Sequence, residues 1–249
     1  MRNLEWRIWL DKTLRMNASR SVYESNKNHR NMEYYTLKTS SDKKVIGCYP
    51  QVDCQTIFQA QLLSPAELMK CPPKLIFELK RSAQMTDVLA TTSGPLTDFL
   101  VNDKTLRVFS EFNLMRHQVF DVTVISSKKN NVVYHWLHFT QPELSFLLDY
   151  QRTEFIETEY GISDVGPIRI ESFNHYLELK SKDKSEGLAF GVRLNQIALS
   201  QNFDLSLDLF HLDPFDSRTF ISKRLKKEMN LIGFEMQKID ILLPENAFE

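Results

Sequence analysis

Glycine is scarce in this sequence, and long apolar runs are missing from it. Seven glycines in 249 residues are few for a fold built on glycine-rich phosphate loops or many tight hairpin turns, since both need backbone conformations that glycine adopts most readily. No stretch reaches the length of a membrane span, and residues 1–11 mix charged residues with Trp6 and Trp9 where a signal peptide has an apolar core. We therefore predict a cytoplasmic protein without a membrane partner.

Cysteine and net charge are also low. Cys48, Cys54 and Cys71 are separated by five and sixteen residues, spacings that fit neither a zinc knuckle nor a C-x-x-C pair. Thiols in a reducing compartment are therefore a simpler interpretation than a disulfide or metal ligands. Because 31 basic residues balance 32 acidic ones, no overall field attracts nucleic acid, and we expect no nucleic-acid partner.

The sequence motifs of nucleotide and ester chemistry are missing. Residues 92–95 read Thr-Ser-Gly-Pro and lack the first glycine of G-x-S-x-G, and neither G-x-x-x-x-G-K nor G-x-G-x-x-G occurs. His135 and His138 are close in sequence, but an offset of three sends them to opposite faces of a strand. We predict no catalytic, cofactor-binding or metal site and no small-molecule substrate.

The residues that are present predict an α+β protein with a mixed β-sheet and packed helices. Apolar residues make up 42% of the chain and charged residues 25%, which is ordinary globular usage. Residues 1–31 form a predicted extension, in which Trp6, Trp9, Leu10 and Leu14 have helical spacing and a polar linker follows. The domain itself is predicted over residues 32–249.

Within that domain, strands and helices alternate without a strict repeat. Alternating or β-branched residues predict strands, and a serine three residues before a glutamate predicts a helix start. The predicted strands are Glu33–Thr39, Val45–Tyr49, Leu75–Lys80, a central strand at Val132–Phe139 and a strand through Leu205, Leu207 and Leu209; the predicted helix begins at residues 64–67.

Two segments share a pattern of extended residues, a capped helix and a strand. The first covers residues 99–124 with a predicted cap at Asp103, and the second covers residues 220–236 with a predicted cap at Ser222. An internal duplication with related halves, 32–150 and 151–249, is one interpretation. Chance is the other, because two copies of a short pattern arise often.

An acidic run is the candidate partner-binding surface. It consists of Glu154, Glu157, Glu159 and Asp164, and no basic residue occurs between Thr153 and Arg169. A solvated edge is the common meaning of such a run, and a surface for a basic partner is the functional one. Paired carboxylates on one strand face could also act in acid–base chemistry. The opposite patch, Lys223, Arg224, Lys226 and Lys227, is predicted to be the outer face of the second helix.

The second segment carries a family resemblance. A strand and turn lead into a helix of the pattern serine, basic residue, leucine, lysine, and a short glycine turn and a strand follow. Residues 209–212 read Leu-Phe-His-Leu, residues 220–226 read Phe-Ile-Ser-Lys-Arg-Leu-Lys, and residues 231–234 read Leu-Ile-Gly-Phe. This order resembles a family of bacterial immunity proteins from polymorphic toxin systems. Residues 32–37 are similar to the usual opening of such proteins, whereas Asp103 stands where the first segment should have a serine cap.

The resemblance implies a binding protein that performs no reaction of its own. Its partner would be a cognate toxin, which it would neutralise by occluding the active site. The acidic run is the predicted interface, because nuclease toxins are often basic. The alternative is a hydrolase or metal-dependent enzyme whose site is assembled from distant residues, such as His211, Asp213 and the acidic run.

Overall fold

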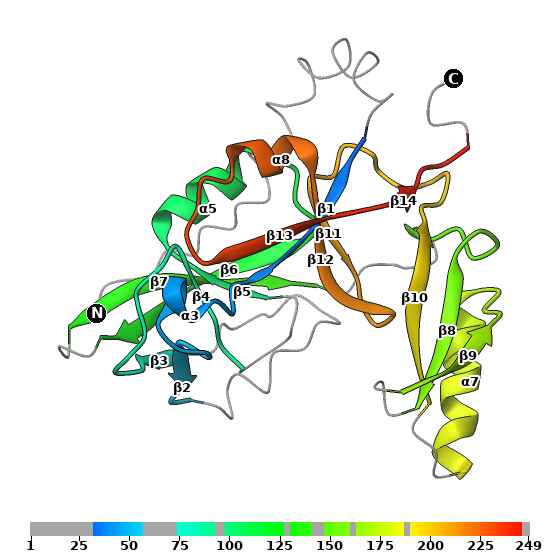
Figure 1. Ribbon diagram of the computed structural model, residues 1–249, viewed down its shortest axis with the longest axis horizontal. Coiled ribbons are helices and arrows are strands. Elements are labelled where there is room, and N and C mark those ends of the chain that lie inside the picture. Colours follow the sequence, from blue (N-terminus) through cyan, green and yellow to red (C-terminus); the bar gives the residue numbers. More distant parts are fainter. Residues whose placement is uncertain are drawn as a thin grey trace, which may run out of the picture. The chain divides into compact units, whose positions relative to one another are not determined.

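A computed structural model describes residues 32–56, 74–92, 98–126, 130–140, 147–159, 163–186 and 190–245 (Figure 1). Residues Glu33 to Pro244 form one compact unit. Its described strands form three sheets and outnumber the helices, so the protein is a sheet-rich α+β protein. No helix within these ranges is both long and apolar enough to cross a bilayer.

The largest sheet has six strands in the order β2-β3-β6-β7-β5-β4. They are β2 (Val52–Cys54), β3 (Ile76–Leu79), β4 (Val88–Leu89), β5 (Phe99–Val101), β6 (His117–Ile125) and β7 (Asn131–Phe139). Strand β7 pairs with both β5 and β6, which confirms the predicted central strand. One face buries an apolar core in which Phe77 stacks on Trp136, with ring centroids 5.5 Å apart.

A second sheet has four antiparallel strands in the order β11-β12-β1-β13. They are β1 (Tyr34–Thr39), β11 (Leu209–Leu212), β12 (Asp216–Ser222) and β13 (Phe234–Ile239). The strand predicted through Leu205 and Leu207 is wrong before Leu209. There the Asp204 carboxylate accepts hydrogen bonds from the backbone and hydroxyl of Ser206, and this local turn replaces the strand pairing.

The third sheet has the order β14-β10-β8-β9. It consists of β8 (Glu154–Glu159), β9 (Ser163–Ile168), β10 (Phe190–Ala198) and β14 (Ile241–Leu242), and helix α7 (Phe173–Glu186) contacts β10. Aromatic rings connect this sheet to the segment before β12. Phe215 contacts Phe155 at 5.3 Å and Tyr176 at 4.7 Å between centroids, and all three are buried.

The strand predicted at Val45–Tyr49 is wrong. Helix α3 (Lys43–Ile46) lies there, because the Asp42 side chain caps the Lys44 amide and Gly47 ends the helix at a φ of 80°. A Cβ at Gly47 would lie 2.0 Å from the Ser82 carbonyl oxygen. The predicted extension, residues 1–31, and the helix start at residues 64–67 lie outside the described residues, as does Cys71.

The two segments that share a pattern form the same kind of unit. In the first, α5 (Asp103–Ser110) connects β5 to β6, and β7 lies between these strands; in the second, α8 (Lys223–Glu228) connects β12 to β13, and β1 lies between them. Because the middle strand is antiparallel to both neighbours, the two outer strands of each unit are parallel. Both are therefore split β-α-β units.

The helix cap is the predicted residue in one unit and a different residue in the other. Ser222 caps α8 as predicted, since its hydroxyl accepts the Leu225 amide at 3.1 Å. The cap of α5 is Asn102, whose side chain accepts the Thr105 amide at 3.0 Å, so the prediction of Asp103 is wrong by one residue. Asn102 is extended as a cap must be, and Asp103 is the first helical residue, with its carboxylate directed to His135.

Candidate functional site

Helices α5 and α8 lie side by side and antiparallel (Figure 1). At one end, Lys104 near the start of α5 donates to the carbonyl of Asn230, which follows α8, at 3.0 Å. At the other end, the Arg224 guanidinium near the start of α8 lies 5.7 Å from the ring centre of Phe112, which follows α5. We call the outward surface of this pair the α5–α8 face.

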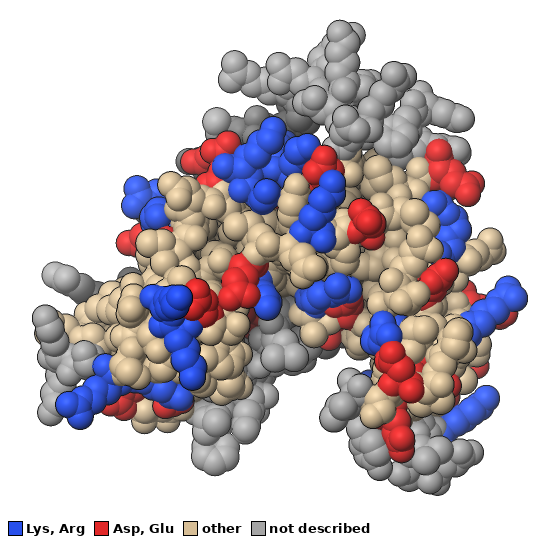
Figure 2. Space-filling model, viewed as in Figure 1, with Lys and Arg blue, Asp and Glu red and all other residues tan. Residues whose placement is uncertain are grey.

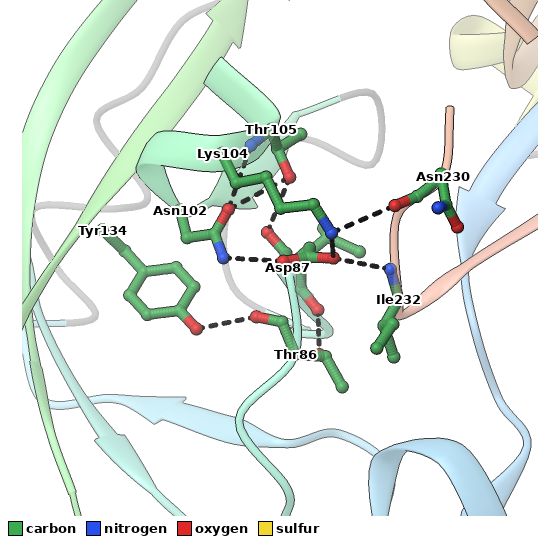
Figure 3. A network of polar contacts seen from close by, with 9 residues as sticks. Thr86, Asp87, Asn102, Lys104, Thr105, Tyr134, Asn230 and Ile232 are labelled. Atoms are coloured by element: carbon green, nitrogen blue, oxygen red, sulfur yellow. Dashed lines mark hydrogen bonds and ion pairs between the residues drawn. The ribbon is translucent and has the colours of Figure 1, made fainter. Parts of the chain in front are cut away.

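Asp87 fixes the start of α5 (Figure 3). Its carboxylate accepts the side-chain amide of Asn102 at 2.9 Å, the ammonium of Lys104 at 2.9 Å and the backbone N–H of Ile232 at 2.8 Å. Burial raises the pKa of Asp87, but these donors, led by the Ile232 amide, outweigh it and hold the pKa below its usual value. One carboxylate therefore joins the cap of α5 to the segment after α8.

Asp208 fixes the start of α8 in the same way. Its carboxylate accepts the Ser222 hydroxyl at 2.6 Å and the Asn113 backbone N–H at 3.1 Å, and it is paired with the Arg224 guanidinium. The partners are of the same three kinds as those of Asp87: the cap residue, the second residue of the helix and an amide just after the other helix. We call these two aspartates the clasp aspartates. Each ties its own helix to the partner unit.

Backbone hydrogen bonds also connect the two split units. The Asp87 N–H donates to the Ile232 carbonyl at 2.9 Å, and the Asp208 N–H donates to the Asn113 carbonyl at 2.6 Å. Gly233, at a φ of 102°, has room for no side chain, because a Cβ there would lie 2.8 Å from the Val88 carbonyl oxygen. The α5–α8 face is therefore fixed by main-chain contacts as well as by carboxylates.

A second set of charged contacts has outer residues at equivalent positions in the two units, with the charges reversed. In the first unit, His135 on β7 faces Asp103 at 2.6 Å and Asp121 at 2.9 Å. In the second, Glu33 beside β1 faces Lys223 at 2.7 Å and Lys238 at 3.4 Å.

The strand register shows that the outer residues of these sets are equivalent, whereas the central residues are not. Asp121 is opposite His135, just as Lys238 is opposite Tyr35, so His135 corresponds to Tyr35, whose hydroxyl donates to Glu33. Asp103 and Lys223 are the first residues of their helices. The same framework thus holds an acid pair at one helix start and a basic pair at the other.

Acid titration should detect the Glu33 contacts. The hydrogen bond from Lys223, followed by that from Tyr35, lowers the pKa of Glu33 from 4.5 to about 2. A lowered pKa adds stability that is complete above the unfolded-state value and is lost as the pH falls through the folded-state value. We expect the urea midpoint of the wild type to exceed that of Glu33→Gln at neutral pH, and this difference to shrink as the pH falls from 4.5 to about 2. A constant difference over that range would contradict the role of Glu33.

Helix α8 is the most basic part of this face. Its six residues carry four cations and one carboxylate, and Figure 2 shows lysine and arginine side chains gathered over it. The Lys226 ammonium lies 4.4 Å from the ring centre of Tyr35, and Arg224 is held by Asp208 and Phe112. Lys226 and Arg224 are exposed, and neighbouring groups hold both side chains in place.

The acidic run predicted as the interface is divided between two faces of the third sheet. Asp164 on β9 is paired with Arg193, which lowers its pKa, and Glu154 accepts the side-chain amide of Asn195 at 2.8 Å. Glu157 and Glu159 point to the other face of β8, with buried Phe155. No described residue forms an ion pair with either of them. The structure therefore brings together only part of the run.

Two residues of the enzyme alternative, His211 and Asp213, lie at the end of β11 and just after it. His211 is fully buried against Phe139, with ring centroids 6.0 Å apart, and burial lowers its pKa to about 4. Asp213 lies in the turn after β11, where burial raises its pKa. His211 is therefore a buried core residue in this structure.

The other titratable residues considered as ligands are placed apart. His135 and His138 lie on opposite faces of β7, as predicted: His135 faces Asp121, and His138 donates to buried Asp98 at 2.8 Å. Cys48 and Cys54 are free thiols. Within the ranges given above, no group of three or more His, Cys, Asp or Glu side chains could hold a metal ion.

The clasp aspartates were missed because a lone aspartate beside a strand is unremarkable by itself. A signal exists in the shared pattern: Asp87-Val88-Leu89 and Asp208-Leu209-Phe210 each begin two strands before a helix cap, at 15 and 14 residues from Asn102 and Ser222. No protein-family model matches the chain, and no curated protein is significantly similar to it.

Proposed function

We propose that this chain is a cytoplasmic immunity protein that binds a cognate bacterial toxin domain and blocks its active site. The sequence resemblance at residues 207–239 motivates the proposal. The observation that carries it is the α5–α8 face, where two short helices are held to both split units by the clasp aspartates. A rigid surface of fixed charges suits a protein that acts by blocking another one.

The physical advantage of such a face is preorganisation. Ordering a long side chain on binding costs about 0.5–1.5 kcal/mol. Lys104, Lys223 and Arg224 are already held by carboxylates before any partner arrives. Less of the binding free energy is then lost to ordering, and the charges can also accelerate encounter with a complementary surface.

The fold supports a related inference, that the two split units are copies of one ancestral unit. It is supported by the shared topology, by the two clasp aspartates and by the tyrosines that stand near the caps. Tyr34 is opposite Ser222 on β12, and Tyr134 donates to the Thr86 carbonyl beside Asp87 at 2.7 Å. The copies do not follow a boundary at residue 150, because β1 lies between β12 and β13.

Co-expression tests the proposed function. A toxin domain encoded beside this chain's gene is expressed in bacteria with the chain or with an empty vector. We expect growth to be restored only with the chain, and the two proteins to co-purify as a stoichiometric complex. Continued toxicity with abundant folded chain, or rescue without a complex, would contradict neutralisation by occlusion.

A further inference from the structure

We infer that α8 and its surroundings form a docking site for an acidic protein surface, an inference that rests on the proposed function and specifies the partner's chemistry. The site is the basic end of the α5–α8 face, and we call it the α8 patch. Its cations are Lys223, Arg224, Lys226 and Lys227 on the helix, with Lys238 on the neighbouring strand β13.

The geometry of a split unit does not require the basic pair of Lys223 and Lys238. The equivalent positions of the first unit hold Asp103 at the helix start and Asp121 on the strand, and there the same framework is closed by His135 between them. Because an acid pair serves this position in one unit, a basic pair in the other is not imposed by the geometry of a split unit. The sign of the charge at these two positions can therefore be set by the partner that binds there.

Lys223 also stands where it weakens the helix. It is the first residue of α8, and the first turn of α8 has no acidic residue. The first turn exposes unpaired N–H groups and carries a partial positive charge, so cations are unfavourable there and acids are favourable. Helix α5 follows the favourable pattern with Asp103 at its start. Residues that break a local rule in this way are expected at functional positions.

The surroundings of the patch favour a protein partner over a nucleic acid. The partly exposed carboxylate of Glu33 lies among its cations and would repel a polyphosphate backbone, but it can receive basic or amide groups on a protein surface. The helix has six residues and is therefore only about 9 Å long. The aromatic rings of Tyr35 and Phe112 are already covered by Lys226 and Arg224 and leave no base-stacking platform.

The test compares charge reversals of equal size. Lys226→Glu with Lys227→Glu changes two exposed residues of the patch that neither clasp aspartate contacts. Lys180→Glu with Lys182→Glu makes the same change on exposed positions of α7, and Glu157→Lys with Glu159→Lys reverses the acidic run. Unchanged urea midpoints would show that each variant is folded.

Association with the toxin domain is measured by stopped flow at low and high salt. We expect the α8 variant to associate about tenfold more slowly at low salt, with the difference narrowing as salt screens the charges, and the α7 variant to behave as wild type. An α8 variant that associates at the wild-type rate would overturn the inference, as would a slowing confined to the Glu157 and Glu159 variant.

A second probe separates this inference from the proposed function. Binding of poly-L-glutamate is measured for the wild type and the α8 variant, and we expect the variant to bind at least about tenfold more weakly, since it exchanges two attractive charges for repulsive ones. Equal binding would overturn the α8 patch even if the toxin is neutralised. Wild-type chain that binds poly-L-glutamate but not the toxin domain would refute the proposed function alone. Tighter α8-dependent binding of duplex DNA would replace the protein partner with a nucleic acid.

Discussion

Replacing Asp208 with alanine is expected to lower the free energy of unfolding by about 3 kcal/mol, because buried donors that lose their acceptor cost about 1–3 kcal/mol each. Asp208 is 2% exposed and accepts from the Ser222 hydroxyl, the Arg224 guanidinium and the Asn113 amide. Arg224 keeps its solvation because it is exposed, so the loss falls mainly on the cap and the amide. Urea unfolding followed by circular dichroism measures the change.

The same substitution should also reduce toxin binding at temperatures where the variant is folded, because α8 loses its tie to the other unit. Asp87→Ala is the matched test in the first unit and should destabilise by a similar amount. Asp240→Ala, an exposed aspartate between β13 and β14, is the control and should change stability by less than about 0.5 kcal/mol. A clasp variant as stable as this control would contradict the role given to the two aspartates.

Asp98→Ala is expected to have the larger effect, a loss of about 4 kcal/mol, because it leaves several buried donors without an acceptor at once. The carboxylate accepts the Trp136 indole N–H at 2.7 Å, the His138 ring N–H at 2.8 Å and the Phe139 backbone N–H at 3.0 Å. The side chains of Asp98 and His138 are both fully buried, so water cannot take its place. Thermal and urea unfolding should give the same ranking.

Asp98→Asn distinguishes hydrogen bonding from packing. Asparagine has nearly the volume of aspartate, but it offers one acceptor oxygen and turns a donor toward another donor. We therefore expect roughly half of the loss seen with alanine. An asparagine variant as stable as wild type would show that the network contributes little, and the core around Trp136 would then be held by packing alone.

Several elements follow from local sequence. The run from Val132 to Phe139 is apolar on both faces and predicts the central strand β7, and the offset of three separates His135 from His138 on that strand. Ser222 predicts the start of α8, because a hydroxyl that caps a helix needs only the amide three residues later. In each case the deciding interactions lie within one strand or one helical turn.

The sequence-based predictions are wrong where a competing local interaction determines the backbone conformation. Val45–Tyr49 reads as a strand by its side chains, but Asp42 and Gly47 close a short helix around Lys43–Ile46. Asp103 was predicted as a cap, and Asn102 one residue earlier supplies the acceptor instead. Asn102 and Asp103 are both residue types suited to capping. The backbone conformation that selects between them depends on the strand that precedes the helix.

The sequence by itself determined the class of the protein: an α+β chain with two strand, helix and strand segments of the same pattern. The tertiary structure decided which charges form a surface. Asp87 meets Ile232, Asp208 meets Asn113 and Glu33 meets Lys223 only after sheets from distant parts of the chain are paired. Local propensity acts over a few residues, whereas a hydrogen bond between such partners exists only once the intervening chain has folded and brought both groups within about 3 Å.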